Sequence, residues 1–143
     1  MAEFELPPEL EKLLSTLEHP DILLTRVSKL LAEESIDLIK QGFRAQTDPY
    51  GRKWKPKQAA DGRMTLSGPT SRLKGGWHRK EVTPGGFRIA PAVDYGIYHQ
   101  SPGPASKLPQ RMMIPDAEKG IPASWRRAYD EAALEVLRQA FSP

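Results

Sequence analysis

The side chains that could carry out catalysis are few in this 143-residue chain, and their spacing does not suit it. There is no cysteine, which excludes disulfides, thiolate metal sites and cysteine nucleophiles. His19, His78 and His99 are not spaced from one another, or from carboxylates, as metal-binding motifs require. Asp94 and His99 would face opposite sides of an expected strand. We therefore expect no catalytic residue, no metal and no cofactor, and predict that the protein is not an enzyme.

Charge is the second kind of chemistry in the sequence, and it is unevenly distributed. Residues 1–40 hold 4 Lys and Arg against 9 Asp and Glu, a net of −5, whereas residues 41–111 hold 13 against 4, a net of +9. Cations flank Trp54 and Trp77, a pattern with which single-strand binders combine phosphate neutralisation and base stacking. Trp is mostly buried in folded domains, so both could instead be core anchors. Nucleic-acid binding by the basic middle region is therefore an alternative function. The acidic and basic regions also favour head-to-tail self-association.

Helical patterns occupy both ends of the chain. Residues 1–20 contain a short helical segment with leucines at i, i+3, i+4 and i+7, and residues 21–44 predict a long helix after His19-Pro20. The apolar residues of the long helix fall on two faces, so it should touch two surfaces: the sheet, the C-terminal helix or a neighbouring subunit. Residues 119–143 contain an amphipathic helix. No run of 18 apolar residues occurs, so we expect no membrane span, and the acidic N-terminus does not resemble an export signal.

The middle of the chain, residues 45–118, predicts a sheet and loops. Residues 76–82 and 87–90 alternate as strands around a turn at Pro84-Gly85-Gly86. We expect a third strand at residues 94–100, a short strand or turn at 112–114, and loops at 56–71 and 101–109. The predicted fold is a single α+β domain over residues 1–143. A small antiparallel sheet is packed by a long N-terminal helix and a C-terminal helix, with long Pro/Gly-rich loops.

Four motifs in order resemble one family. Residues 48–56 (DPYGRKWKP) resemble its DPxGxxWxP motif, and residues 71–77 (SRLKGGW) resemble the TGRLxxSI segment that starts its first long strand. Residues 95–100 (YGIYHQ) and 108–114 (LPQRMMI) resemble its YAxIHQfGG…iPaRpfL block. From about residue 20 onward the chain is similar to the phage virion morphogenesis, or tail-completion, family. This family includes the S protein of P2-like phages and the G protein of Mu-like phages, and it is related to siphophage neck proteins.

The chain departs from the family pattern at three places. Thr70-Ser71 replaces Thr-Gly, Ser101-Pro102-Gly103 replaces the aromatic and double glycine, and Met112-Met113-Ile114 replaces Pro-Phe-Leu after the arginine. The resemblance implies a structural protein that completes the head-proximal end of the tail or neck and supports head–tail joining. It further implies a ring-shaped homo-oligomer, with tail-tube, terminator or head-connector proteins as partners and weak DNA contact as an open question. The expected location is the virion, after assembly in the bacterial host cytoplasm.

The motif residues have expected physical roles. Asp48, Pro49 and Gly51 fix the turn after the long helix, and Trp54 is buried under the sheet. Arg72 and Arg111 suit bidentate pairing with a carboxylate at an interface, or a purely intrachain role. His99 and Gln100 end a strand and hold the following loop. The full set of candidate assembly residues is Asp48, Pro49, Gly51, Trp54, Arg72, Leu73, Tyr95, Tyr98, His99, Gln100 and Arg111.

Overall fold

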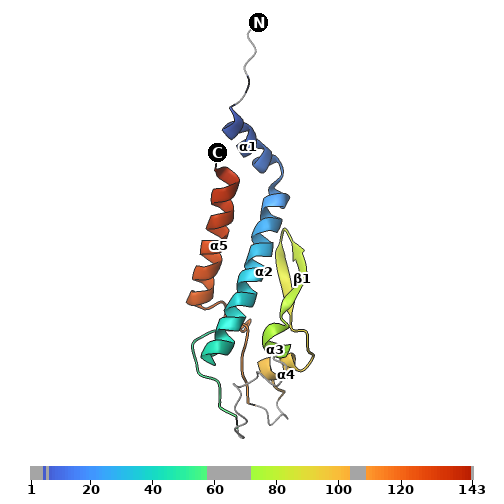
Figure 1. The fold of residues 1–143 in the computed structure, drawn as a ribbon, viewed down its shortest axis with the longest axis vertical. Coiled ribbons are helices and arrows are strands. Elements are labelled where there is room, and N and C mark those ends of the chain that lie inside the picture. Colours follow the sequence, from blue (N-terminus) through green and yellow to red (C-terminus); the bar gives the residue numbers. More distant parts are fainter. Residues whose placement is uncertain (1–4, 6, 58–71, 104–108, 143) are drawn as a thin grey trace.

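The computed structural model describes residues 5, 7–57, 72–103 and 109–142, and its fold is α+β, as the sequence predicts. The loop expected at 56–71 and the centre of that at 101–109 lie outside these residues. The elements in chain order are α1 (Pro8–Glu18), α2 (Pro20–Ala45), α3 (Arg72–Gly75), β1 (His78–Thr83), β2 (Gly86–Ala90), α4 (Gly96–Gln100) and α5 (Ala123–Phe141). The molecule is elongated, with α1 at one end and the loops at the other (Figure 1).

The long helix α2 is the axis of the fold. It begins with Pro20 in its first turn, where the missing N–H would be unpaired, and ends at Gln46, whose left-handed φ of 57° closes the helix. α5 packs on one side of it and the β1–β2 hairpin on the other (Figure 1). The prediction that α2 touches two surfaces is therefore confirmed, with both surfaces in the same chain.

Small residues let these neighbours approach α2 closely. The buried residues along its middle are Ser28, Ala32 and Ser35, while the flanking leucines of the predicted stripe are only half-buried. Ser35 donates a hydrogen bond from Oγ to the Leu31 carbonyl (2.8 Å), so its oxygen is left to accept from the Tyr129 hydroxyl of α5 (2.5 Å). Burial of the Tyr129 hydroxyl raises its pKa. This polar pair fixes the α2–α5 register.

The sheet consists of two antiparallel strands. His78 pairs with Ala90 and Thr83 with Gly86, and the register shifts between Arg79 and Glu81 at a bulge. Pro84-Gly85 forms the two-residue connection, as the sequence predicts. The ring of Phe87 contacts that of Tyr129 edge to face at 6.5 Å, so the hairpin also reaches α5.

Three predictions about the middle region are wrong. Residues 96–100 form the short helix α4 rather than a third strand, because Ser101 N–H bonds back to the Ile97 carbonyl and Tyr98 N–H to that of Tyr95. Asp94 and His99 therefore do not share a strand. Residues 112–114 form neither the expected strand nor a turn: they belong to an extended segment that the side chain of Gln100 holds (Figure 1). The TGRLxxSI-like segment also does not begin β1, since residues 72–75 form α3 and β1 starts at His78.

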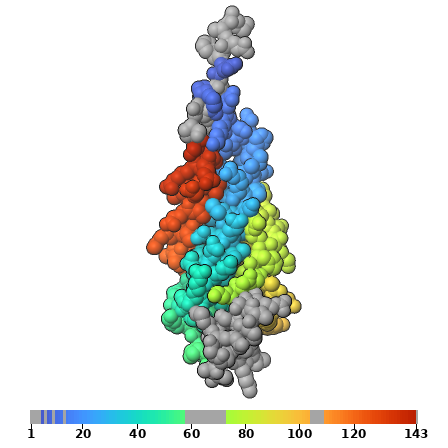
Figure 2. Space-filling view, in the orientation of Figure 1, coloured from blue at the N-terminus to red at the C-terminus, as the bar shows by residue number. Residues whose placement is uncertain are grey.

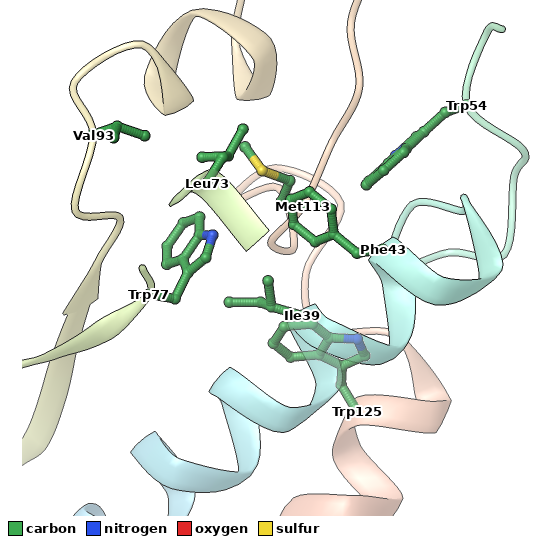
Figure 3. Close-up of a cluster of buried hydrophobic side chains, with 8 residues drawn as sticks. All are labelled: Ile39, Phe43, Trp54, Leu73, Trp77, Val93, Met113 and Trp125. Carbon is green, nitrogen blue, oxygen red and sulfur yellow. The ribbon is translucent and has the colours of Figure 1, made fainter. Parts of the chain in front are cut away.

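The hydrophobic core lies toward the loop end of the molecule. It joins the end of α2 to α3, α5 and the extended segment, and Figure 3 shows its side chains converging from all four. The cluster comprises Ile39, Phe43, Trp54, Leu73, Trp77, Val93, Met113 and Trp125. The helical end has no comparable cluster among the residues that the structure describes.

Candidate functional site

The turn after α2 forms as the DPxG-like motif predicts. Asp48 Oδ1 accepts hydrogen bonds from the backbone N–H groups of Tyr50 (2.8 Å) and Arg52 (2.9 Å). Gly51 has a φ of 87°, which only glycine adopts without strain. A backbone bridge between Thr47 and Lys53 then aligns the chain so that Trp54 points back toward α2. Asp48 and Gly51 thus have the structural roles expected of them, and Pro49 lies inside the same turn.

Trp54 is buried, but not under the sheet as expected. Its ring meets Phe43 edge to face at 5.2 Å, at the end of α2 (Figure 3), and its Nε1 donates to the Met112 carbonyl at 3.0 Å. Trp77 is buried as well. Neither indole presents a face to solvent, so the base-stacking pattern suggested by the flanking cations is not available in this structure.

Gln100 holds the extended segment in place of a third strand. Its Oε1 accepts from the N–H groups of Met113 (2.7 Å) and Ile114 (3.0 Å), and its Nε2 donates to the Ile114 carbonyl (2.9 Å). One amide side chain thus satisfies three backbone groups that a strand partner would otherwise pair. The side chain of Gln100 thus holds residues 113 and 114, which lie beyond the loop that it was expected to hold, and Gln100 ends a helix and not a strand.

Arg111 is buried with 8% of its surface exposed, and its partners differ from the expected carboxylate. Nε donates to the Lys55 carbonyl (3.0 Å) and Nη2 to the Pro56 carbonyl (3.3 Å). Within the described residues the guanidinium forms no ion pair, and burial lowers its pKa. Arg111 therefore ties two motifs together inside one chain, as the purely intrachain alternative predicts, and pairing with a carboxylate at an interface stays a prediction.

His99 sits beside Arg111. Its carbonyl accepts from the Arg111 N–H (2.9 Å), and its ring lies edge-on to Tyr95 at 6.3 Å. Burial, and secondarily the positive charge of Arg111, lower the pKa of His99. Its buried Nδ1 has no hydrogen-bond partner among the described groups. Burial and the charge of Arg111 both favour the neutral form of the His99 ring.

The remaining candidate residues divide between the core and the surface. Leu73 is 1% exposed and packs in the core, whereas Tyr98 on α4 and Tyr95, which precedes α4, are 60% and 49% exposed. The side chain of Arg72 lies outside the described part of the structure. Three of the four motifs thus meet in one hydrogen-bonded cluster, the motif hub, formed by residues 48–56, 99–100 and 110–114.

Two residues of this end were missed by the sequence reasoning. The Tyr50 hydroxyl accepts from the Asp116 N–H (3.0 Å) and donates to the Gly120 carbonyl (2.5 Å), which fixes the segment leading to α5. Gly96 packs so tightly that an added Cβ would lie 2.9 Å from Leu73 Cδ1. Nothing in the local sequence distinguishes these two from ordinary turn residues, because both roles depend on distant partners.

The helical end presents a different surface. α1 turns polar residues toward α2 and α5, where Lys12, Ser15 and Thr16 line a groove of about 330 Å³. Lys12 Nζ donates to the carbonyls of Gln139 (3.2 Å) and Ser142 (2.7 Å) at the end of α5, where a cation is favoured. The apolar side of α1 faces away from this groove, since residues 10, 14 and 17 lie about 180° from those that line it. These leucines are 45%, 45% and 62% exposed.

Other apolar side chains are exposed near α1. The start of α2 and the last turns of α5 lie beside it (Figures 1 and 2). They expose Ile22, Leu24, Leu137 and Phe141. Ile22 lines the groove, whereas Leu10, Leu14 and Leu17 lie on the opposite side of α1, so the exposed apolar residues of this end are on more than one face.

No catalytic or metal-binding arrangement is evident in the described residues. Among them, no three His, Asp or Glu side chains come together as the ligands of a metal ion would. None of the helices in the described ranges has the length and apolar content needed to cross a membrane. Comparison with protein-family models, with curated proteins and with solved structures finds no match for this chain.

Proposed function

We propose that the protein is a structural phage morphogenesis protein that completes the head-proximal end of the tail or neck and supports head–tail joining. It works by self-assembly and docking, not by catalysis, as a ring-shaped homo-oligomer within the virion, after assembly in the host cytoplasm. Its further partners are tail-tube, terminator or head-connector proteins. The order of the four family-like motifs supports this assignment.

The observation that carries the proposal is the outward-facing leucine stripe of α1. A helix that directs its polar side to the groove beside α5 and exposes Leu10, Leu14 and Leu17 leaves apolar area in water, which costs free energy until a partner covers it. A catalytic domain needs no such surface, whereas a subunit of an assembly does.

The occupant that we assign to this surface is a second copy of the chain. The residues around α1 are acidic: six of the nine acidic residues among the first 40 precede residue 22. Residues 41–111 form the basic region, with a net charge of +9. The parts of it that the structure describes lie along α2 and at the end of the molecule opposite α1 (Figure 1). The acidic, apolar end of one copy is therefore complementary to the basic region of the next, and a repeated heterologous contact closes into a ring.

Native mass spectrometry and light scattering test the self-association. We expect an oligomer for the unaltered chain, and at least a tenfold weaker association for Leu14→Glu/Leu17→Glu. Ile121→Glu/Leu134→Glu is the matched control, because it places two acids on exposed apolar residues that lie outside both the acidic end and the basic region, and it should leave association unchanged. A monomer at all concentrations, or equal effects of the two variants, would contradict the assigned occupant.

The phage role is tested separately. A phage deleted for this gene should produce filled heads and tails that fail to join, and complementation should require Leu14 and Leu17. Normal infectious particles without the gene would contradict the proposed function, whatever the oligomeric state.

A further inference from the structure

A cationic groove lies on the surface of the motif hub. It has a volume of about 260 Å³, and its walls carry Arg52, Lys53, Lys55 and Lys119. These four side chains come from two segments more than 60 residues apart, so their meeting is a product of the fold. All four are exposed. Their charges are therefore available to a ligand.

The cations of the groove are not neutralised by the chain. Within the described residues none of the four forms an ion pair with a carboxylate, and the ion pairs present involve other residues. The one carboxylate on the groove wall, Asp48, already accepts two backbone hydrogen bonds. Asp116 and Glu118 precede Lys119 in the chain, and the guanidinium of Arg111 adds a charge beside Lys55. The groove keeps an excess of positive charge.

The walls of the groove are held in place. Lys53 Nζ donates to the Ala45 carbonyl at the end of α2 (2.9 Å), and Lys119 Nζ lies 5.7 Å from the centroid of the Tyr50 ring. Arg52 follows the rigid turn at Asp48, and Lys55 follows the anchored Trp54. Since these supports already order the backbone, little further entropy is lost when a ligand binds.

The apolar part of the groove indicates the class of partner. The apolar side chains that line it, Trp54 and Met112, are buried, so it offers little of the exposed apolar area that forms the centre of a protein–protein interface. Protein–DNA interfaces are polar and strongly positive instead. Because the indole is anchored at Phe43 and Met112, it cannot stack on a base.

We propose that this groove binds the phosphate backbone of double-stranded DNA, without sequence preference. Duplex DNA carries the highest density of phosphate charge, and four cations on one groove suit a short stretch of backbone. The inference goes beyond the assembly role and does not depend on it. It also replaces stacking on Trp54 and Trp77 by phosphate contact as the mode of nucleic-acid binding.

Fluorescence anisotropy with a labelled 20-base-pair duplex tests the groove. The triple variant Arg52→Gln/Lys55→Gln/Lys119→Gln should lose at least tenfold in affinity at 50 mM salt, and its log–log salt slope should fall by about 3. Lys53 is spared because it caps α2. The control Arg79→Gln/Lys80→Gln/Arg88→Gln removes the same charge from the hairpin and should retain most of the affinity. Lys55→Glu alone, which changes one exposed residue, should weaken binding in the same direction.

Three results would overturn the inference. The first is no binding by the unaltered chain at 50 mM salt. The second is an equal loss in the two triple variants, which would mean that net charge alone attracts DNA. The third is competition by polyglutamate as effective as that by unlabelled duplex of equal charge, which would assign the groove to an acidic protein surface. Because the acidic end of a neighbouring copy would compete for the same cations, binding is measured at protein concentrations below those at which the chain associates.

Discussion

The loop end and the helical end of this molecule use their side chains in opposite ways. At the loop end, apolar residues converge in a core, and the polar motif residues Gln100 and Arg111 are engaged with backbone groups of the same chain. At the helical end, polar residues face inward and Leu14 and Leu17 face outward. The motif residues therefore have structural roles within the chain. The surface that we propose for a partner lies on α1, which the four motifs do not include.

Charge separates the two ends as well. The acidic residues around α1 lie far along the molecule from the cationic groove of Arg52, Lys53 and Lys55 (Figure 1). α2, which separates the two regions, has 26 residues and is therefore about 39 Å long, several times the Debye length at physiological salt, so the opposite charges do not attract within one chain. The described side chains of both sets are exposed to solvent and available to another molecule, which is why this comparison bears on the proposed assembly and DNA binding.

The largest expected difference between the two ends is in stability. Phe43→Ala should lower the free energy of unfolding by about 3–5 kcal/mol, because a residue 1% exposed leaves a cavity in the core. Leu17→Ala, at 62% exposure, should change it by less than about 0.5 kcal/mol. Urea unfolding of both variants at low protein concentration measures the contrast. Similar losses would show that α1 is part of the folding unit and not an exposed arm.

The second expected effect isolates the motif hub. Gln100→Leu leaves two N–H groups and one carbonyl of residues 113–114 without their partner, which should cost roughly 2–4 kcal/mol. Gln100→Glu keeps both accepting bonds and loses only the donated one, so it should cost about half as much. Chemical denaturation checks the order. A stability equal to that of the unaltered protein in Gln100→Leu would mean that the hub is not needed to hold this segment.

A smaller effect concerns pH at the same end. The pKa of His99 is lowered by burial and by Arg111, so the folded chain holds fewer protons than the unfolded chain just below pH 6.5, its ordinary value. Stability should therefore be fully present above that pH and should decrease as the pH falls toward the lowered pKa. His99→Gln should flatten this part of the profile of thermal midpoint between pH 8 and 5. An unchanged slope would assign the acid sensitivity to other groups.

The smallest effect lies between the helices. Burial, Asp37 and Glu131 raise the pKa of Glu34, so its ionised form is disfavoured in the folded chain. Folding therefore favours the protonated carboxyl of Glu34. The ionised carboxylate lowers the stability of the folded chain at neutral pH, and this destabilisation is absent well below pH 4.5. Glu34→Gln should raise the melting temperature by about 1–2 °C at pH 7 and leave it unchanged at pH 4.

A matched carboxylate distinguishes this from a general charge effect. Glu81 is exposed on the hairpin and lies 3.3 Å from Arg88 Nε. Glu81→Gln removes the same charge as Glu34→Gln, but that charge has a favourable partner in Arg88. The variant should therefore not raise the melting temperature. An equal rise in both variants at pH 7 would show that net charge, and not the Glu34 environment, is responsible.

Local sequence signals predicted most of the elements. Helical periodicity placed α2 and α5, Pro84-Gly85 placed the hairpin connection, and Asp48 with Gly51 placed the turn after α2. Each of these depends on residues within a few positions of one another. The prediction of a third strand was wrong because Tyr95, Ile97 and Gln100 have no strong local preference between strand and helix. Gln100 bonds to backbone groups 13 and 14 residues away, which no local pattern indicates.

The sequence by itself determined the α+β class, the two-sided long helix and the opposite charges of the two regions, because periodicity, turn chemistry and composition are local properties. Only the tertiary structure decided that Trp54 packs on Phe43, that Arg111 bonds to carbonyls, and that Lys119 joins Arg52 and Lys55 at one groove. It also decided which side of α1 faces the body. These are contacts between distant segments, and the packing of the whole chain sets them.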